Sequence, residues 1–137
     1  MAESGYSGTP LAKKLGLKPG ANVLIQNSPK AYFQFFEDAP EELIFSRENS
    51  IESIDFIHTF CASTDQIEEV NNLLKPRLKK DGILWISWPK GGSKIKTELN
   101  RDIIRAYFLA NGLVDIKVAS IDEDWSGLKF VYRLMDR

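Results

Sequence analysis

The run Ile83-Leu84-Trp85-Ile86-Ser87-Trp88 constrains the fold more than any other feature of the sequence. It is almost continuously apolar, which is typical of a strand whose two faces are both covered. Such strands occur where helices alternate with strands along the chain and pack on both sides of one sheet. The run therefore predicts an α/β fold in which Trp85 is largely buried.

Five further runs read as strands, because they are short, apolar and rich in β-branched or aromatic residues. They are residues 22–26, 42–46, 54–61, 113–121 and 127–134. The last two have no helical pattern between them. We therefore expect an antiparallel pair joined by a turn through Trp125-Ser126-Gly127, in which Gly127 supplies a positive φ.

Start and stop signals for helices predict four helices between most of these strands, at residues 9–16, 28–40, 63–74 and 97–111. Ser63 and Gln66 form a capping box at the start of the third helix, and Pro76 is expected to break or kink that helix near Leu74. The fourth helix is amphipathic. Its expected inward residues are Leu99, Ile103, Ala106, Tyr107 and Ala110.

These elements predict a three-layer α/β domain with an open, mostly parallel sheet and a C-terminal antiparallel hairpin. In chain order, the expected arrangement of strands across the sheet is 2-1-3-4-6-5, with strand 6 antiparallel. We expect one domain over residues 9–137 and a loosely ordered N-terminus at residues 1–8, which are small and polar.

Composition excludes several classes of function. The 137-residue chain has a net charge of −1, which argues against binding nucleic acid by bulk electrostatics. One Cys and one His exclude an intramolecular disulfide and make a transition-metal site improbable. The chain has no long apolar run and MAESGYSGTP is unlike a signal peptide, so we expect a cytoplasmic protein without a membrane partner.

Three segments resemble the class I methyltransferase fold: KPGANVL at 18–24, DFI at 55–57, and LKP at 74–76 with KDGIL at 80–84. This resemblance covers roughly residues 17–134 and also includes the closing hairpin. It implies a Rossmann-like sheet.

A second resemblance rests on GYSGTPL at 5–11, KLGLKPG at 14–20, WPK at 88–90 and DWSGLK at 124–129. These motifs are similar to those of a bacterial family of short, stand-alone proteins of unknown function. That resemblance implies a fold and no chemistry.

Ligands of open α/β sheets bind outside the carboxyl ends of the strands, so the residues at those ends are the candidate site residues. The candidates are Asn27, Ser28, Arg47, Ser63, Trp88, Lys90, Lys94 and Trp125. A site for S-adenosylmethionine (SAM) or a dinucleotide needs glycines after the first strand, and residues 26–30 contain none. The acidic residue expected after the second strand is replaced by Ser46-Arg47. We therefore predict no cofactor.

The loop from Lys90 to Lys96 is basic and contains two glycines, so it is either an anion site or a solvated surface loop. Asp122, Glu123 and Asp124 are interpreted as a solvated turn rather than a metal site. His58 is interpreted as a half-buried structural residue and Cys61 as a small core residue, so neither is expected to be catalytic.

The sequence favours a non-catalytic, methyltransferase-like domain that binds a small anionic ligand or a protein partner at the strand ends. Two alternatives stay open. One is a divergent SAM-dependent methyltransferase, and the other is a protein-interaction module that uses Trp88 or Trp125.

Overall fold

The computed structural model describes residues 11–29, 43–46 and 53–137. Its elements are α1 (Leu11–Leu15), β1 (Asn22–Gln26), β2 (Ile44–Phe45), β3 (Ile54–Phe60), α2 (Thr64–Glu69), η2 (Val70–Leu74), η3 (Lys75–Arg77), β4 (Leu78–Pro89), α3 (Arg101–Ala110), β5 (Leu113–Ser120), β6 (Trp125–Tyr132) and η4 (Leu134–Asp136). The helix expected at residues 28–40 and the candidate Arg47 lie outside the described residues. So does the loosely ordered segment expected at residues 1–8.

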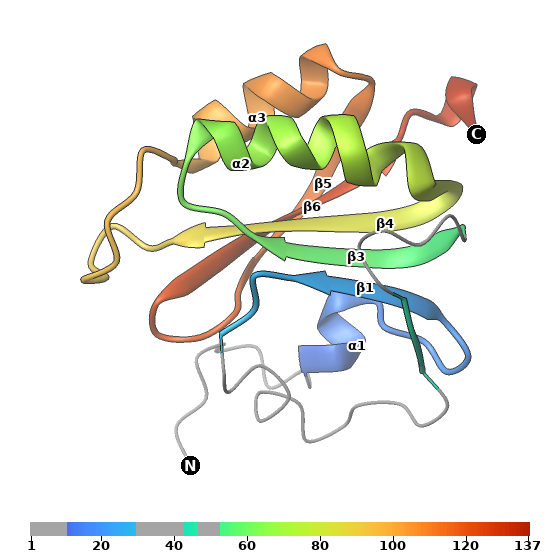
Figure 1. Ribbon diagram of the computed structural model, residues 1–137, viewed down its shortest axis with the longest axis horizontal. Helices are drawn as coiled ribbons and strands as arrows, with labels where there is room; N and C mark the ends of the chain where they lie inside the picture. The colour runs from blue at the N-terminus through green and yellow to red at the C-terminus, as the bar shows by residue number, and fades with distance from the viewer. Residues whose placement is uncertain (1–10, 30–42, 47–52) are drawn as a thin grey trace.

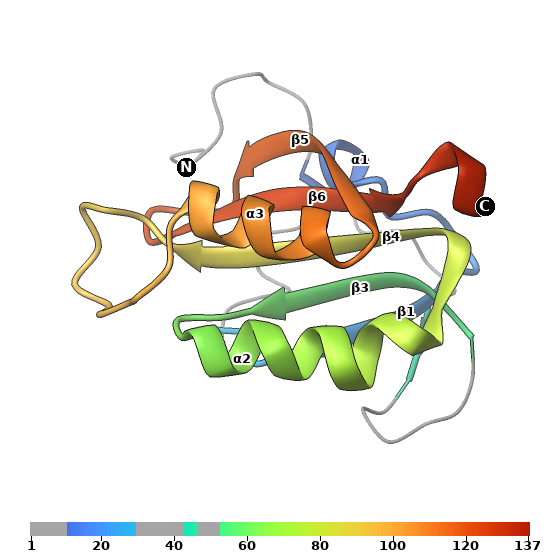
Figure 2. The same ribbon diagram turned by 90° about the horizontal axis from the view of Figure 1, so that it is seen from above.

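The six strands form one sheet in the order β2-β1-β3-β4-β6-β5, as the sequence predicted. β1 to β4 pair in parallel, whereas β6 runs antiparallel to both β4 and β5. Helices α2 and α3 cover one face of the sheet and α1 lies on the other (Figures 1 and 2). This arrangement confirms the expected three-layer, methyltransferase-like α/β fold.

A separate apolar cluster fills each side of the sheet. The α2/α3 side includes Leu84, Ile104, Phe108 and Phe130, and the α1 side includes Trp85. Trp85 has no exposed surface, and its indole N–H donates to the Leu15 carbonyl at 2.8 Å. The expected burial of Trp85 is confirmed.

Two expectations about the third helix and the fourth strand need correction. The helix does not break near Leu74, but its hydrogen-bonding pattern changes there, from a π-helix over Val70–Leu74 to a 3₁₀ turn over Lys75–Arg77. Pro76 occupies the first turn of that 3₁₀ segment, where its missing N–H costs little. Strand β4 then begins at Leu78, five residues before the apolar run.

The predicted inward face of the fourth helix was also wrong at most positions. Helix α3 starts at Arg101, after the extended N-cap Asn100, and its buried residues are Ile104 and Phe108. Ile103 is 40% exposed, and Ala106 and Ala110 are exposed. Leu99 is buried but precedes the helix, and Tyr107 packs at the edge of the core.

The hairpin turn lies earlier than expected. Trp125, Ser126 and Gly127 belong to β6, and the turn is formed by residues 121–124. Gly127 does not have a positive φ. Its ideal Cβ would lie 3.0 Å from both Ser87 Oγ and Trp85 Cε3, so close packing between strands favours glycine there. No helix in the described part of the chain is long and apolar enough to cross a membrane.

Candidate ligand groove at the end of strand β4

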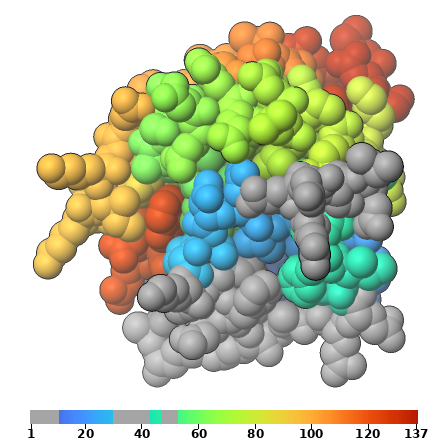
Figure 3. Space-filling model, viewed as in Figure 1, coloured from blue at the N-terminus to red at the C-terminus, as the bar shows by residue number. Residues whose placement is uncertain are grey.

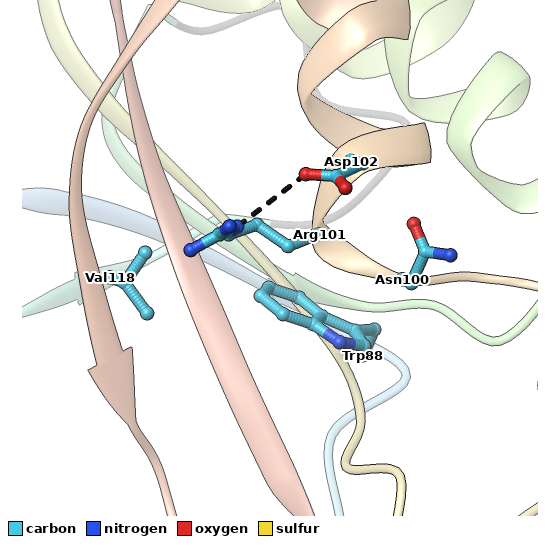
Figure 4. A pocket seen from close by; sticks show the side chains of 5 residues that line it. All are labelled: Trp88, Asn100, Arg101, Asp102 and Val118. Carbon is cyan, nitrogen blue, oxygen red and sulfur yellow. Dashed lines mark ion pairs between the residues drawn. The ribbon is translucent and has the colours of Figure 1, made fainter.

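An open groove of about 430 Å³ lies where β4 ends and α3 begins, on the α2/α3 side of the sheet (Figure 4). Its lining residues are Trp88, Asn100, Arg101, Asp102 and Val118, and we call it the Trp88 groove. Trp88 is the second-last residue of β4, and Val118 lies on the edge strand β5. The other three residues come from the first turn of α3 and its N-cap.

Arg101 supplies the positive charge of the groove. Its side chain is 61% exposed, and its Nε lies 3.7 Å from an oxygen of Asp102, which is itself 85% exposed. Such a surface ion pair contributes at most about 1 kcal/mol, so the guanidinium can exchange its partner cheaply. Asn100 is fixed next to it, because its Oδ1 accepts from the Ile103 N–H at 2.9 Å.

Trp88 provides an apolar wall that is only 8% exposed. In the sheet register Trp88 lies beside Ser126, and Ser126 lies beside Ser120 of β5. The Lys90 ammonium donates to Ser120 Oγ at 2.7 Å, so Lys90 is held next to the groove. The structure thus brings together two of the candidates named from sequence, Trp88 and Lys90.

The rest of the basic loop is tied to its surroundings. Lys90 N–H and Ser93 Oγ both donate to Asp124, which anchors the loop to the hairpin turn. Figure 3 shows the loop, coloured gold, standing out from one end of the molecule above that turn. Lys94 is exposed in the projecting part.

The segment after this loop joins the ends of β3 and β4. Thr97 Oγ1 and the Glu98 N–H both donate to the Ala62 carbonyl, at 2.9 and 3.0 Å. The Glu98 carboxylate accepts from the Thr64 N–H at 2.7 Å, at the start of α2. The negatively charged Glu98 carboxylate therefore lies at the N-terminus of α2.

The remaining candidates at this edge do not join the groove. Ser63 caps α2 in the predicted capping box with Gln66. Asn27 and Ser28 are exposed after β1, and Asn27 has a left-handed φ of 58°. Trp125 is half-buried on the opposite side of the sheet, where its ring meets Phe60 edge-on with centroids 5.0 Å apart.

The single His and the single Cys are both sealed in the core. His58 has no exposed surface, so it is fully rather than half-buried, and its Nε2 lies 2.7 Å from Ser87 Oγ. Burial lowers the pKa of His58 to about 3, which keeps the ring neutral. Burial likewise raises the pKa of the Cys61 thiol to about 11, as expected for an inert core residue.

The acidic turn serves the hairpin. Asp122 Oδ1 accepts from the N–H groups of Asp124 and Trp125, both at 2.8 Å. No group of three or more potential metal-ligating side chains occurs among the residues that the structure describes.

Sequence reasoning missed four of the five groove residues. Asn100 before Arg101-Asp102 is a recognisable N-cap signal, and it would have placed the start of α3 beside the end of β4. Val118 carries no such signal, because its position depends on the pairing of β5 with β6.

No protein-family model matches the chain, and no curated protein matches it in sequence. Among solved structures, it is similar to a TehB-like SAM-dependent methyltransferase from Corynebacterium glutamicum. Identity is 12%, the match covers 90% of this chain and 86% of that chain, and the TM-score is 0.57. A putative type 11 methyltransferase from Sulfolobus solfataricus gives 16% identity, coverage of 90% and 89%, and a TM-score of 0.60.

The structure of a DhpI–SAH complex is also similar, with 8% identity, coverage of 91% and 83%, and a TM-score of 0.60. At these identities the likeness shows the fold alone. The structural neighbours are class I SAM-dependent methyltransferases, in agreement with the first resemblance. Membership of the bacterial family of unknown function stays a prediction.

Proposed function

We propose that the chain is a non-catalytic, methyltransferase-like domain that binds a small anionic ligand in the Trp88 groove. One observation carries this proposal. The chain's own segment 97–98 ties the ends of β3 and β4 together, whereas the Trp88 groove beside them stays open.

The hydrogen bonds made by residues 97–98 argue against an anionic cofactor at the end of β3. There the Glu98 carboxylate takes both the N–H and the hydroxyl of Thr64, at 2.7 and 3.2 Å. A phosphate or carboxylate of a ligand would have to displace that group or approach it closely, and like charges repel. Nearby, Thr59 Oγ1 donates to Gln26 Oε1 at 2.7 Å, so the end of β1 is occupied by an internal contact.

The Trp88 groove has the chemistry of a small-molecule site. Trp88 offers a flat apolar wall, and Arg101 offers a guanidinium with five donors and only a loose partner. Lys90 adds a second positive charge at the rim. A carboxylate or phosphate can replace Asp102 at Arg101, because both oxyanions accept the paired donors of a guanidinium.

A divergent SAM-dependent methyltransferase is the second candidate, and one observation favours it. Asn27 adopts a φ of 58° immediately after β1, which is the left-handed conformation that a glycine would supply there. The backbone can therefore turn as a cofactor loop requires, although Asn27 retains a Cβ that a glycine lacks.

Calorimetric titration of SAM into protein at tens of micromolar separates the two candidates. We expect no binding, and a dissociation constant below about 100 μM, roughly −5.5 kcal/mol, would overturn the non-catalytic proposal. A thermal-shift screen of carboxylates, nucleotides and phosphorylated metabolites then tests the groove.

An anion that binds the groove should lose at least about tenfold in affinity in Arg101→Gln, equivalent to about 1.4 kcal/mol. Lys96→Gln is the matched control, since Lys96 is an exposed cation outside the groove. Equal affinity in both variants places the ligand elsewhere. If neither SAM nor any anion binds, the interaction-module hypothesis built on Trp88 replaces the proposal.

A further inference from the structure

We propose that a second anion site, specific for a phosphate group of a small molecule, lies on the α1 side of the sheet between Lys18, Lys117 and Lys129. We call these three residues the lysine cluster. The site is independent of the Trp88 groove, which lies on the other side of the sheet.

The sheet itself brings two of the lysines together. Lys117 of β5 and Lys129 of β6 are directly paired in the antiparallel register. Side chains paired in this way have Cβ atoms about 5 Å apart, and like charges at such positions destabilise the sheet. Lys129 in turn pairs with Trp85 of β4, whose ring belongs to the α1-side core.

The third lysine comes from the turn that precedes β1. Lys129 is half-buried, and its pKa is lowered first by burial and then by the charges of Lys117 and Lys18. Its Nζ lies 3.4 Å from the position that a Cβ on Gly16 would occupy, so the ammonium rests against the backbone after α1. The half-buried ammonium of Lys129 therefore lies within the influence of two exposed positive charges, those of Lys117 and Lys18.

The end of α1 offers this cluster one carbonyl partner but no full negative charge. The carbonyls of residues 12–15 already accept hydrogen bonds, including one from Lys117 to the Lys14 carbonyl at 3.0 Å and one from Trp85. Ion pairs in the described residues join Lys79 to Asp55, Arg101 to Asp102 and Arg105 to Asp115, and none of them reaches the lysine cluster. Within the described part of the chain no carboxylate pairs with these ammonium groups, and an anionic ligand would relieve the repulsion between them.

A phosphate monoester or diphosphate suits this arrangement best. A monoester carries a charge of about −1.5 to −2 at neutral pH and a diphosphate carries more, and their several oxygens can each accept from a different ammonium. Lysine binds phosphate as a point charge without the planar geometry that arginine imposes, which fits three lysines from three elements. A carboxylate has less charge and fewer acceptor oxygens.

Inorganic pyrophosphate is the probe, and thermal unfolding of the whole chain at constant ionic strength is the measurement. We expect pyrophosphate to raise the melting temperature of the wild type. In Lys129→Met, which keeps the apolar stem and removes the charge, the affinity should fall at least about tenfold. Lys96→Gln again serves as the control, because Lys96 is exposed outside the cluster.

A second variant keeps the test decisive if Lys129→Met folds poorly. Lys117→Glu places a carboxylate opposite Lys129, so it should unfold at a higher temperature than the wild type without ligand and show no response to pyrophosphate. A purely structural role for Lys117 predicts the reverse, because the bond to the Lys14 carbonyl is lost.

Three results would overturn the proposal. Pyrophosphate could fail to stabilise the wild type, or it could stabilise Lys129→Met equally. Sulfate at the same ionic strength could also produce the whole effect, which would indicate general exclusion from the protein surface. Binding of a single-stranded oligonucleotide without any effect of pyrophosphate would indicate a nucleic-acid surface instead.

Discussion

His58 should make the stability of this protein unusually sensitive to mild acid. The ring is completely buried, and its pKa is lowered from 6.5 to about 3 by that burial. In the unfolded chain His58 binds a proton below about pH 6.5, whereas in the folded protein it stays neutral until about pH 3. Protonation therefore favours the unfolded state throughout this window, and stability falls as the pH falls from about 6.5.

The size of the effect follows from the width of the window. Each pH unit within it removes up to about 1.4 kcal/mol, so about 3 kcal/mol is lost between neutral pH and about pH 4.5. Small domains are stable by only about 5–15 kcal/mol, so this one group accounts for a large share. The loss ends near the folded pKa of about 3.

The assay is urea unfolding at a series of pH values for the wild type and for His58→Gln. Glutamine does not titrate, and it retains a group that can bond to Ser87, which lies 2.7 Å from His58 Nε2. Carboxylates that titrate below about pH 5 affect both proteins equally, so the difference between the two curves isolates His58. Parallel curves from neutral pH to about pH 4.5 would refute the reasoning.

Three further changes probe the core and the loop. Trp85→Ala should cost about 3–5 kcal/mol or prevent folding, because the side chain is fully buried, and an unchanged melting temperature would contradict its assigned place in β4. Gly127→Ala should cost about 1–3 kcal/mol in chemical unfolding, since its Cβ would meet two neighbours at 3.0 Å, whereas Gly92→Ala has open space and should be nearly neutral. Lys90→Ala combined with Lys94→Ala should change stability by only about 0.5 kcal/mol but weaken a groove-bound anion, increasingly so at low salt. Retention of the full anion affinity by that double variant would exclude both lysines from the site.

The sheet could be predicted from the sequence because its order follows from the types and spacing of successive elements. Short runs rich in Val, Ile and aromatic residues mark the strands, and the continuous run at 83–88 marks the centre. Crossovers between parallel strands are nearly always right-handed, which leaves few possible orders. The order β2-β1-β3-β4-β6-β5 is the outcome.

Element boundaries were less predictable, and they decide which side chains face the core. Reading the fourth helix as starting at residue 97 put Ile103 inside, whereas the extended Asn100 delays the start to Arg101. The helix then presents Ile104 and Phe108 to the sheet. The apolar pattern fits two alternative faces of the helix, and the N-cap at Asn100 decides between them.

The two candidate sites could not be predicted from the sequence for a different reason. Strand β5 contains one extra residue, which changes the face on which later side chains lie. Strict alternation puts Asp115 and Lys117 on the same face of a strand. The register shifts between these two residues, so that Asp115 pairs with Phe130 and Lys117 with Lys129. Such a bulge turns the following residues over. Asp115 consequently meets Arg105 of α3, while Lys117 reaches the Lys14 carbonyl on the α1 side.

The same bulge orients both proposed ligand sites. Beyond it, Val118 faces the Trp88 groove and Ser120 holds Lys90 on the α3 side. Lys117 faces Lys129 on the other side. If Ile116 paired with Lys129 in a regular register, Lys117 would turn toward α3 and Val118 toward α1, and neither site would form. Deleting Ile116, the unpaired residue of the bulge, leaves Asp115 opposite Phe130 and Lys117 opposite Lys129, so it should preserve anion binding at both sites, whereas the substitutions at Arg101 and Lys129 should each weaken binding at one site only.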